Sequence, residues 1–516
     1  MHESRYVSET PITHRKDYAQ YFTPSLVARI MVKWIIKGNP KTILDPAFGL
    51  GIFYDEICKT KFKDQIDFIG YEIDDKILSY LTYDNNNLTI LNEDYLQADH
   101  DNFDGVICNP PYMRFQKFLN RHNVLPLIEK KIGKKLVGYA NISSVFLIKS
   151  LNELNQNGRL AYIMPFEFFN TGYGEEIKRS LLKNHLLKHI IIFQNEKEIF
   201  SDATTTVCLL LCLNDGRDGN IKITRIKSEK EIREINDIED LNFVELTSKE
   251  LPVNQKWSPI ILSLFSTQEI PDGLVKITTY GSFNRGIATG ANEFFALSRS
   301  DIIKLELTKS NICECITKSP QIQKLIFTDE DFDTLSQADM PVYCLDVKDH
   351  NNEAVKKYIK KGEELGFHTR YLTRMRKPWY KIESRKPAPI LFGVFNRGRF
   401  KVIRNYTSAI NFTCFHSFYP NGLFGRNEVD KIFIYFLSDI GQSIMTLNKR
   451  AYGENLDKLE PGDLNDCLCP SQNQFALISQ GEVEKIIETA KINQDLAIKM
   501  SNTLIEKITS PALETE

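Results

Sequence analysis

Short apolar runs alternate with stretches of helical periodicity along the first 213 residues. The runs of strand length lie in the segments KTILD, FIGYE, LTILNED, DGVIC and RLAYIMP, and a more hydrophobic one, TTTVCLLLCL, covers 204–213. Each is short and bounded by turn-forming or charged residues, which favours strands over helices. The pattern therefore predicts at least six strands before residue 214.

Helices are predicted between these strands. Residues 24–37 place apolar side chains at helical spacing, with Thr23 as the N-cap, Pro24 at the first helical position and Gly38 after the last turn. Another helix is expected over about 141–156, where Asn157-Gly158 would stop it. Strands separated by helices indicate a parallel sheet covered on both faces, the doubly wound α/β class.

Polar side chains end four of the predicted strands. They are Asp45, Glu72, Asp94 and Asn109. Parallel strands bring their carboxyl ends to one edge of a sheet, where ligands bind in this fold class. We therefore expect these four residues to form a binding site.

The acidic strand ends favour a nucleoside held without a phosphate clamp. The loop DPAFGLG allows close backbone approach but lacks the Gly-Lys-Ser/Thr ending of a phosphate loop. Glu72 could accept hydrogen bonds from a ribose diol, and Asp94 could either bind an adenine amino group or cap a helix. We expect Asp74 and Asp75 to be solvated acids. S-adenosylmethionine, which has a cationic sulfur and no phosphate, fits better than NAD.

The segment Asn109-Pro110-Pro111-Tyr112 ends the fourth strand with a stiff backbone. The Asn109 amide oxygen and the Pro110 carbonyl would form two adjacent acceptors for the two hydrogens of an exocyclic amine. Holding both hydrogens would free the nitrogen lone pair for attack on a methyl group, with catalysis by placement and polarisation. Tyr112 would stack on the base. Because an amide is no general base, the proton must leave after the transfer.

These segments together resemble the γ-group of amino-methylating DNA methyltransferases, especially type II restriction-modification enzymes that make N6-methyladenine. The resemblance covers about residues 13–213 and follows the family's motif order. The matching segments are AQYFTP (19–24), LDPAFGLGIF (44–53), GYEID (70–74), NEDYL (92–96), NPPY (109–112) and IFSDATTTVCLLL (199–211). Asn before Pro-Pro resembles the adenine enzymes more than the cytosine-N4 enzymes.

The resemblance implies a fold, a cofactor and site residues. The fold would be a Rossmann-like, mostly parallel seven-stranded sheet, and the cofactor S-adenosylmethionine. Catalysis would involve Asn109, Pro110, Pro111 and Tyr112, with Tyr112 and Phe200 stacking on a flipped base. The implied cofactor-binding residues are Tyr21, Phe22, Thr23, Asp45, Pro46, Ala47, Gly49, Gly51, Glu72, Ile73, Asp94, Tyr95 and Asn109.

The C-terminal half is expected to be a mixed α+β domain that recognises DNA. A turn cluster and a charged stretch within 214–250 place the boundary between domains 1–245 and 246–516. Between Arg370 and Arg404 the sequence has eleven Lys and Arg residues and one acid, Glu383. Aromatic residues are interleaved with these cations, as in nucleic-acid-binding surfaces. A single final helix is predicted over roughly 481–508.

DNA contacts are expected from basic and aromatic residues of both domains. They are Arg114, Arg285, Arg374, Arg376, Lys377, Trp379, Tyr380, Arg397 and Arg399. The alternative for the basic segment is a solvated β-surface without a ligand.

Composition limits the other classes of function. The net charge of −2 means that any nucleic-acid-binding surface must be local. The ten cysteines lack metal-binding spacing, so we expect reduced structural thiols. No metal is expected either, because the sulfonium of S-adenosylmethionine already supplies the electrophile. No apolar stretch reaches membrane-spanning length, and we expect a cytoplasmic, nucleoid-associated monomer from a bacterium or archaeon.

The expected function is methylation of adenine N6 in duplex DNA, paired with a restriction endonuclease. Two alternatives remain open from the sequence. One is an RNA or protein-glutamine methyltransferase, because the NPPY tetrapeptide also occurs in such enzymes. The other is a DNA-binding module with an inactive cofactor fold.

Overall fold

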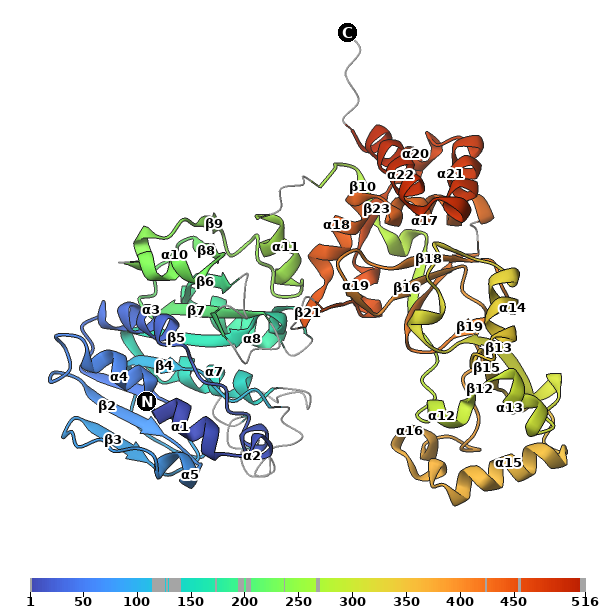
Figure 1. The fold of residues 1–516 in the computed structure, drawn as a ribbon. Coiled ribbons are helices and arrows are strands. Elements are labelled where there is room, and N and C mark those ends of the chain that lie inside the picture. The colour runs from blue at the N-terminus through green and yellow to red at the C-terminus, as the bar shows by residue number, and fades with distance from the viewer. Residues whose placement is uncertain are drawn as a thin grey trace, which may run out of the picture. The chain divides into compact units, whose positions relative to one another are not determined.

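The computed structural model describes residues 2–113, 126, 129, 141–171, 174–193, 199–200, 206–235, 237–265, 270–422, 425–452 and 456–510. The chain forms two compact units, one of residues 1–265 and one of nearly all of 266–516 (Figure 1). Sequence analysis placed the boundary at 245/246. Residues 257–263 stay with the first unit because Trp257 is fully buried there and its ring lies 4.9 Å from that of Phe169.

A single sheet forms the centre of the first unit. Its strand order is β3-β2-β1-β4-β5-β7-β6-β8-β9 (Figure 1). The strands are β1 (Thr42–Asp45), β2 (Asp67–Tyr71), β3 (Leu88–Leu91), β4 (Phe103–Cys108), β5 (Leu154–Pro165), β6 (Leu187–Phe193), β7 (Val207–Leu213), β8 (Ile221–Ile226) and β9 (Val244–Leu246).

The sheet is mixed and larger than the expected seven strands. Strands β3, β2, β1, β4 and β5 are parallel, whereas β7 runs antiparallel to both β5 and β6. Strands β8 and β9 extend the sheet to nine strands among the described residues. Sequence analysis treated part of 214–250 as a boundary segment, yet Ile221, Ile223 and Ile226 are buried and hold β8 in the sheet. It also missed β6, whose apolar run directly follows a helix.

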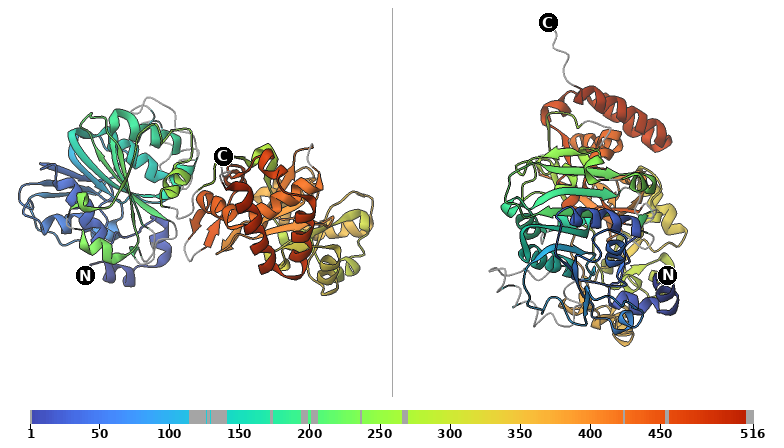
Figure 2. Two further views of the ribbon diagram at one scale, coloured as in Figure 1. Left: turned by 90° about the horizontal axis from the view of Figure 1, so that it is seen from above. Right: turned by 90° about the vertical axis from the view of Figure 1, so that its left-hand side faces the viewer.

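Helices cover both faces of this sheet, as Figure 2 shows in its left-hand view. Neighbouring residues of β1 point to opposite faces, so Ile43 and Leu44 belong to different apolar cores. The core around Ile43 includes α3 (Ser25–Ile36), α4 (Ile52–Cys58) and α10 (Glu229–Glu234). The core around Leu44 includes α7 (Ile142–Asn152), α8 (Gly174–Leu182) and α11 (Trp257–Ser263). The prediction of a doubly wound α/β unit is confirmed in this layered arrangement.

Helix α3 begins one residue later than expected. Its N-cap is Pro24, whose carbonyl accepts hydrogen bonds from Val27 and Ala28, and no side chain caps the helix. The predicted cap, Thr23, is buried, and its hydroxyl instead accepts a hydrogen bond from Asn109. Thr23, predicted to cap this helix, therefore binds Asn109 in the loop that follows β4.

The helix predicted over 141–156 is shorter than expected. Helix α7 ends at Asn152 and β5 already begins at Leu154. Asn157 adopts a positive φ of 64°, but it lies within the strand segment and does not end a helix. The polar sequence NQNG obscured the strand because its first residues do not alternate with apolar ones.

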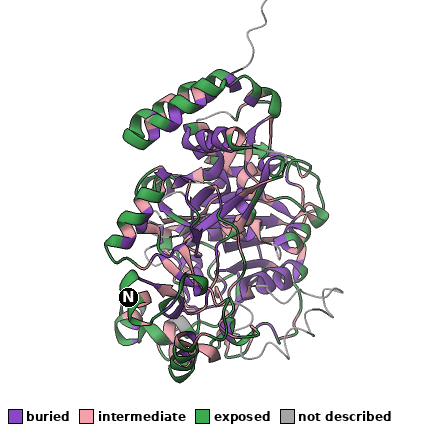
Figure 3. Cartoon of the chain, turned by 90° about the vertical axis from the view of Figure 1, so that its right-hand side faces the viewer, coloured by how far each residue is buried: buried purple, intermediate pink, exposed green. Residues whose placement is uncertain are grey.

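The second unit contains several small sheets with helices around them. The strand orders are β11-β20-β16-β18-β14, β12-β15-β13-β19, β17-β22-β21 and β10-β23. The strands are β10 (Leu274–Lys276), β11 (Gly281–Arg285), β12 (Ala296–Leu297), β13 (Ile312–Ile316), β14 (Ile326–Phe327), β15 (Tyr343–Leu345), β16 (Ile390–Gly393), β17 (Phe395–Arg397), β18 (Val402–Asn405), β19 (Ile410–Asn411), β20 (Phe415–Pro420), β21 (Arg450–Tyr452), β22 (Leu456–Lys458) and β23 (Leu468–Pro470). Figure 3 shows buried residues concentrated in the strands and inner helix faces.

Eleven helices of the described second unit surround these sheets. They are α12 (Asn292–Phe295), α13 (Arg299–Lys304), α14 (Asp329–Gln337), α15 (Glu353–Glu364), α16 (Tyr371–Arg374), α17 (Arg426–Leu437), α18 (Asp439–Asn448), α19 (Pro461–Asn465), α20 (Gln472–Ala476), α21 (Gln480–Ile492) and α22 (Gln494–Thr509). The single final helix expected over 481–508 is wrong. Asn493 adopts an extended conformation and its side chain caps α22, which divides the segment into two helices that pack on each other.

In the described part of the chain, no helix combines the length and hydropathy needed to cross a membrane.

Candidate active site and nucleic-acid interface

A cavity of about 600 Å³ lies at the carboxyl ends of the parallel strands in the first unit. Glu72 follows β2, Asp94 lies three residues after β3, and Asn109 follows β4, and all three line it. The loop after β1 adds Pro46, Ala47 and Gly49. The expectation that the polar strand ends converge is confirmed for Glu72, Asp94 and Asn109.

The cavity lining is acidic. It includes the carboxylates of Asp17, Glu72, Glu93 and Asp94, and the described residues that line it include no lysine or arginine. Aromatic and aliphatic side chains supply the rest, among them Tyr18, Tyr21, Phe22, Ile77, Ile142 and Phe146. A cavity with this charge suits a cationic ligand and disfavours one with several phosphates.

Asp45 supports the cavity from behind without lining it. Its side chain is fully buried, and Oδ1 accepts a hydrogen bond from the Ala47 amide at 3.1 Å. Oδ2 is buried and has no hydrogen-bond partner among the described residues. Burial raises the pKa of the Asp45 carboxyl well above its usual range. Asp45 therefore holds the loop backbone and keeps one acceptor unsatisfied next to the cavity wall.

The two glycines of the loop have different positions. Gly49 lines the cavity with φ +56°, and its amide donates to Glu72 Oε2 at 2.9 Å. Gly51 has φ +81° and is the N-cap of α4, away from the cavity lining. The left-handed backbone favours glycine at both positions, and at Gly51 a Cβ would also clash with the Tyr83 hydroxyl.

Glu72 is the most constrained acid of the cavity. Its Oε1 accepts hydrogen bonds from the amides of Ile73 and Asp74 at 2.8 and 2.9 Å, and its Oε2 accepts one from Gly49. Burial raises the pKa of Glu72 to about 7, although these amides lower it. A carboxylate offers about four acceptor positions. The described residues occupy three of these positions and leave one, on Oε2, for a ligand.

Asp94 lines the cavity and caps a turn over 95–97, not a helix, and its binding of an adenine amino group stays a prediction. Its Oδ1 accepts a hydrogen bond from the Leu96 amide at 3.0 Å, as a capping side chain does, and its Oδ2 accepts one from Gln97 at 2.9 Å. Tyr95 lines the cavity as well, but its side chain is buried and its hydroxyl donates to Glu153 at 2.7 Å.

The Asn109 amide has a defined orientation. Its Nδ2 donates to the Tyr21 carbonyl at 2.9 Å and to Thr23 Oγ1 at 3.0 Å. Oδ1 therefore points away from these two acceptors and accepts a hydrogen bond from the Tyr112 hydroxyl at 2.7 Å. An amide oxygen has two lone pairs, so one acceptor position remains. Both prolines of the loop line the cavity next to Asn109.

The two residues expected to stack on a base, Tyr112 and Phe200, both contact the apolar core around Ile43. The Tyr112 ring is half-buried and lies 5.9 Å from the Tyr21 ring, and its hydroxyl also reaches the Ile163 carbonyl at 3.2 Å. Phe200 is 7% exposed and packs edge-on against Phe193 at 5.5 Å. Neither Tyr112 nor Phe200 is part of the cavity lining.

The segment AQYFTP predicted that Tyr21 and Phe22 belong to this site, but the contribution of the residues before that segment was not predicted. Helices α1 (His2–Glu9) and α2 (Ile12–Asp17) precede a segment in which Asp17, Tyr18, Ala19 and Gln20 line the cavity beside Tyr21 and Phe22. Their polar sequence gave no apolar periodicity to indicate helices.

The expectation that Asp74 is a solvated acid is wrong. The residue is 2% exposed and binds side chains of this N-terminal segment. The local segment EIDD gives no sign that Asp74 is buried. Its partners, His14 and Gln20, lie more than fifty residues away in the chain. Asp75, next to it, is exposed as expected.

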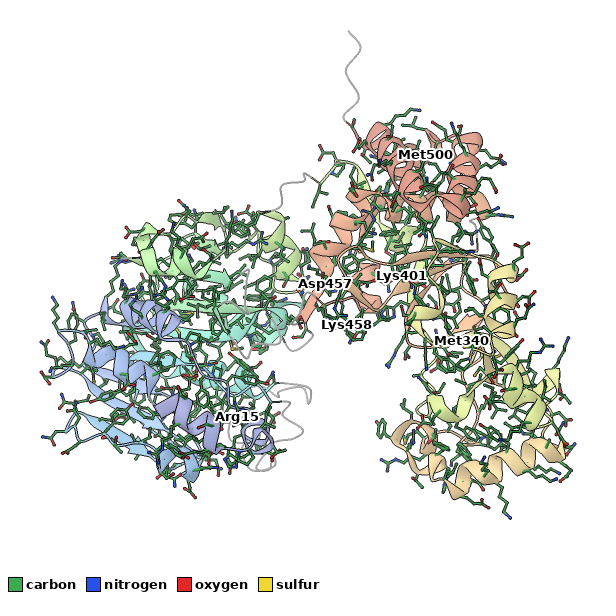
Figure 4. All side chains as sticks on the ribbon, in the orientation of Figure 1. Arg15, Met340, Lys401, Asp457, Lys458 and Met500 are labelled. Carbon is green, nitrogen blue, oxygen red and sulfur yellow. The ribbon has the colours of Figure 1, made fainter. Side chains whose placement is uncertain are left out.

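Five of the residues expected to contact DNA are exposed on the second unit, and one of these, Arg399, also pairs with Asp439 at 2.6 Å. Arg285 ends β11, Arg374 ends α16, Lys377 follows α16, and Arg397 ends β17. Large apolar side chains are exposed beside Arg374, with Tyr371 at 69% and Met375 at 70%. Figure 4 shows the side chains around the β17-β22 region near Lys458. Arg114 lies outside the described residues.

The other expected DNA contacts are engaged within the unit. Arg376 donates to the carbonyls of Ala288 and Thr289, and burial lowers its pKa. The Trp379 ring lies 4.9 Å from Phe294. Tyr380 packs in the same apolar core. The interleaved aromatics thus serve mainly as packing for a basic surface.

Both halves of the chain match known protein families. Residues 42–200 match the family described as Eco57I restriction-modification methylase, and residues 255–505 match the C-terminal domain of type II methyltransferase M.Eco57I. Type II methyltransferase M.AccI of Acinetobacter calcoaceticus is 37% identical over 476 residues, covering 90% of this chain and 87% of that protein.

More distant relatives cover the same length. Type II methyltransferase M.XamI of Xanthomonas campestris pv. amaranthicola is 21% identical over 485 residues, covering 89% of this chain and 87% of that protein. The structure of the type IIL restriction-modification enzyme MmeI in complex with DNA has a TM-score of 0.57 at 13% identity, covering 94% of this chain and 71% of that one, and this likeness concerns the fold. From the near-complete match to M.AccI and the two family matches, the chain belongs to the type II DNA methyltransferases of restriction-modification systems.

Proposed function

We propose that this protein methylates the N6 amine of a specific adenine in duplex DNA, with S-adenosylmethionine as methyl donor. The observation that carries the proposal is the Asn109 amide, whose Oδ1 is oriented by Tyr21 and Thr23 at the edge of an acidic cavity. An amide oxygen fixed beside a prolyl carbonyl is suited to accept from an exocyclic amine.

The cavity would hold the cofactor through its acids and its apolar walls. Glu72 has one acceptor position left for a ribose hydroxyl, and Asp94 lies where an adenine amino group could donate. The absence of lysine and arginine from the described lining fits a ligand that is cationic and has no phosphate. When bound, the cofactor supplies an electrophilic methyl group on a cationic sulfur.

The residues of the NPPY loop would act on the target amine by positioning it. Asn109 Oδ1 and the Pro110 carbonyl would each accept one of its hydrogens, which draws the nitrogen towards tetrahedral geometry and raises its nucleophilicity. The Tyr112 hydroxyl, now bonded to Oδ1, would share that oxygen or move aside when the base enters. The proton would leave to solvent after the transfer, since Asn109 cannot accept it.

Adenine in a duplex hides its N6 from a cavity at the end of a sheet, so the base must flip out of the stack. Tyr112 would form one face of the slot for the flipped base. Phe200 would reach the other face only after leaving its contact with Phe193, because it is buried in this structure.

The second unit would hold the DNA through its exposed cations. Arg285, Arg374, Lys377 and Arg397 are exposed on the second unit and could neutralise phosphates or contact base edges. Since these methyltransferases belong to restriction-modification systems, the methylated site would be protected from a partner endonuclease. We propose that the protein acts as a monomer associated with the nucleoid.

Transfer of a labelled methyl group to duplex DNA, followed by nucleoside analysis, tests the proposal. We expect label in N6-methyladenine alone. Label in cytosine, in RNA or in glutamine side chains would overturn it, and binding of the cofactor without any transfer would support an inactive module instead. Sequencing of methylated DNA from cells that express the protein then identifies the site.

A further inference from the structure

The N-terminal segment of residues 2–22 lies against the cofactor cavity and is attached through one buried carboxylate. His14 Nε2 and Gln20 Nε2 lie 2.9 and 2.6 Å from Asp74 Oδ2, and the Tyr6 hydroxyl lies 3.2 Å from the same oxygen. The Tyr6 hydroxyl also donates to Gln20 Oε1 at 2.7 Å. Side chains from α1, α2 and the segment after α2 therefore converge on a single oxygen atom.

Apolar contacts reinforce this attachment. Tyr6 is fully buried and forms a small core with Leu50 and Ile77, against which Phe22 and Tyr80 pack. At the end of α1, the Tyr80 hydroxyl donates to Glu9 at 2.6 Å. The segment is thus held at both its beginning and its end. Its last residues, from Asp17 to Phe22, line the cavity.

Asp74 also connects the segment to the acid beneath it. Its amide donates to Glu72 Oε1 at 2.9 Å, while its Oδ1 accepts a hydrogen bond from the Lys76 amide at 3.0 Å and so caps α5 (Asp75–Leu78). Although burial favours the neutral carboxyl, hydrogen bonds from His14 and Gln20 keep the pKa of Asp74 below its usual range. The carboxylate is charged, buried and used entirely for holding other groups.

We infer that Asp74 is a positioning residue that fastens the N-terminal segment over the cofactor cavity and thereby retains the bound cofactor. The inference rests on the proposed function, because the ligand it retains is the methyl donor. Asp74 itself does not line the cavity, so its effect would be transmitted through Gln20, which does, and through Glu72.

The test compares Asp74→Asn with Asp75→Asn in the full-length protein. Asp75 is the next residue, exposed at the start of α5 and bonded to Asn92, so the two variants make the same chemical change at adjacent positions. In Asp74→Asn we expect the Kd for S-adenosylmethionine, measured without DNA, to rise about tenfold or more, because hydrogen bonds to a buried charge are lost. In Asp75→Asn we expect a change of less than about twofold.

Two further readouts separate positioning from general damage. The KM for the cofactor should rise in Asp74→Asn while kcat at saturating cofactor stays within about threefold. Cofactor should also protect the peptide bond after Arg15, which lies in α2 (Figure 4), from trypsin in the wild type and not in the variant.

If Asp74→Asn does not fold, Tyr6→Phe and His14→Ala together remove two of the three donors and should raise the Kd in the same direction. Equal affinities in the Asp74 and Asp75 variants, or a loss confined to kcat, would overturn the inference. A wild-type protein that does not bind the cofactor would instead overturn the proposed function.

Discussion

Replacing Thr23 with valine tests how the amide of Asn109 is oriented. Thr23 is 4% exposed, and its Oγ1 accepts one of the two Asn109 hydrogen bonds, at 3.0 Å. Valine has nearly the same shape but no oxygen. Asn109 keeps its bond to the Tyr21 carbonyl, so the orientation is weakened and not abolished.

The size of the effect follows from that single bond. A neutral hydrogen bond contributes about 0.5–1.5 kcal/mol net, which corresponds to a fall in kcat of roughly two- to tenfold if the bond matters fully in the transition state. The KM for the cofactor should change little if Thr23 acts on Asn109. If Thr23 instead binds the cofactor directly, as the family resemblance implies, the KM should rise.

A double-mutant cycle makes this test specific. We expect Thr23→Val to have no further effect on the residual activity of Asn109→Ala, since the partner of Thr23 is then gone. Ser25→Ala is the matched control, because Ser25 opens the same helix and bonds Glu56 at 2.9 Å, outside the site. Wild-type kcat in Thr23→Val, or additive losses in the cycle, would refute the reasoning.

Three other outcomes are expected. Asn109→Ala should lower the transfer rate by roughly a hundred- to a thousandfold while leaving cofactor binding largely intact, by turnover and calorimetry; near-normal turnover would contradict its role. Since burial raises the pKa of Glu72 to about 7 and ligand hydroxyls favour its ionised form, cofactor affinity should fall as pH drops from 8 to 6. The Glu72→Gln variant should lose this pH dependence. Cofactor affinity that does not change with pH in the wild type would refute the assigned role of Glu72. Arg374→Ala should reduce the slope of log DNA affinity against log salt concentration by the equivalent of roughly one phosphate contact. Arg376→Ala should mainly lower the thermal stability of the second unit, because Arg376 bonds backbone carbonyls within it.

The Glu72 carboxyl also affects stability, with a definite sign. Its pKa of about 7 in the folded protein exceeds the ordinary value of 4.5, so the folded state binds the proton more tightly than the unfolded state. Stability without ligand should therefore decrease as pH rises from about 4.5 to about 7. Cofactor binding would act in the opposite direction, because it favours the ionised carboxylate.

Local patterns in the sequence were enough to predict the strands that carry the site. Apolar runs ending at Glu72 and Asn109 identified β2 and β4, and parallel strands must bring such ends to one edge. Strands β6 and β8 were not predicted. Strand β6 is buried along nearly its whole length and follows a helix, and β8 is a short strand in a charged region, so neither shows a clear alternation of apolar and polar residues.

The sequence by itself determined which chemical groups the site would contain, because strand ends, glycines and an Asn-Pro-Pro segment are local features. Only the tertiary structure decided how those groups are used. Thr23 orients Asn109 and does not cap a helix, Asp74 binds the N-terminal segment and is not solvated, and Trp379 packs against Phe294. Each of these contacts depends on a partner distant in the chain. A buried polar group without a hydrogen bond raises the free energy of the folded state, so the fold that supplies the partner is favoured.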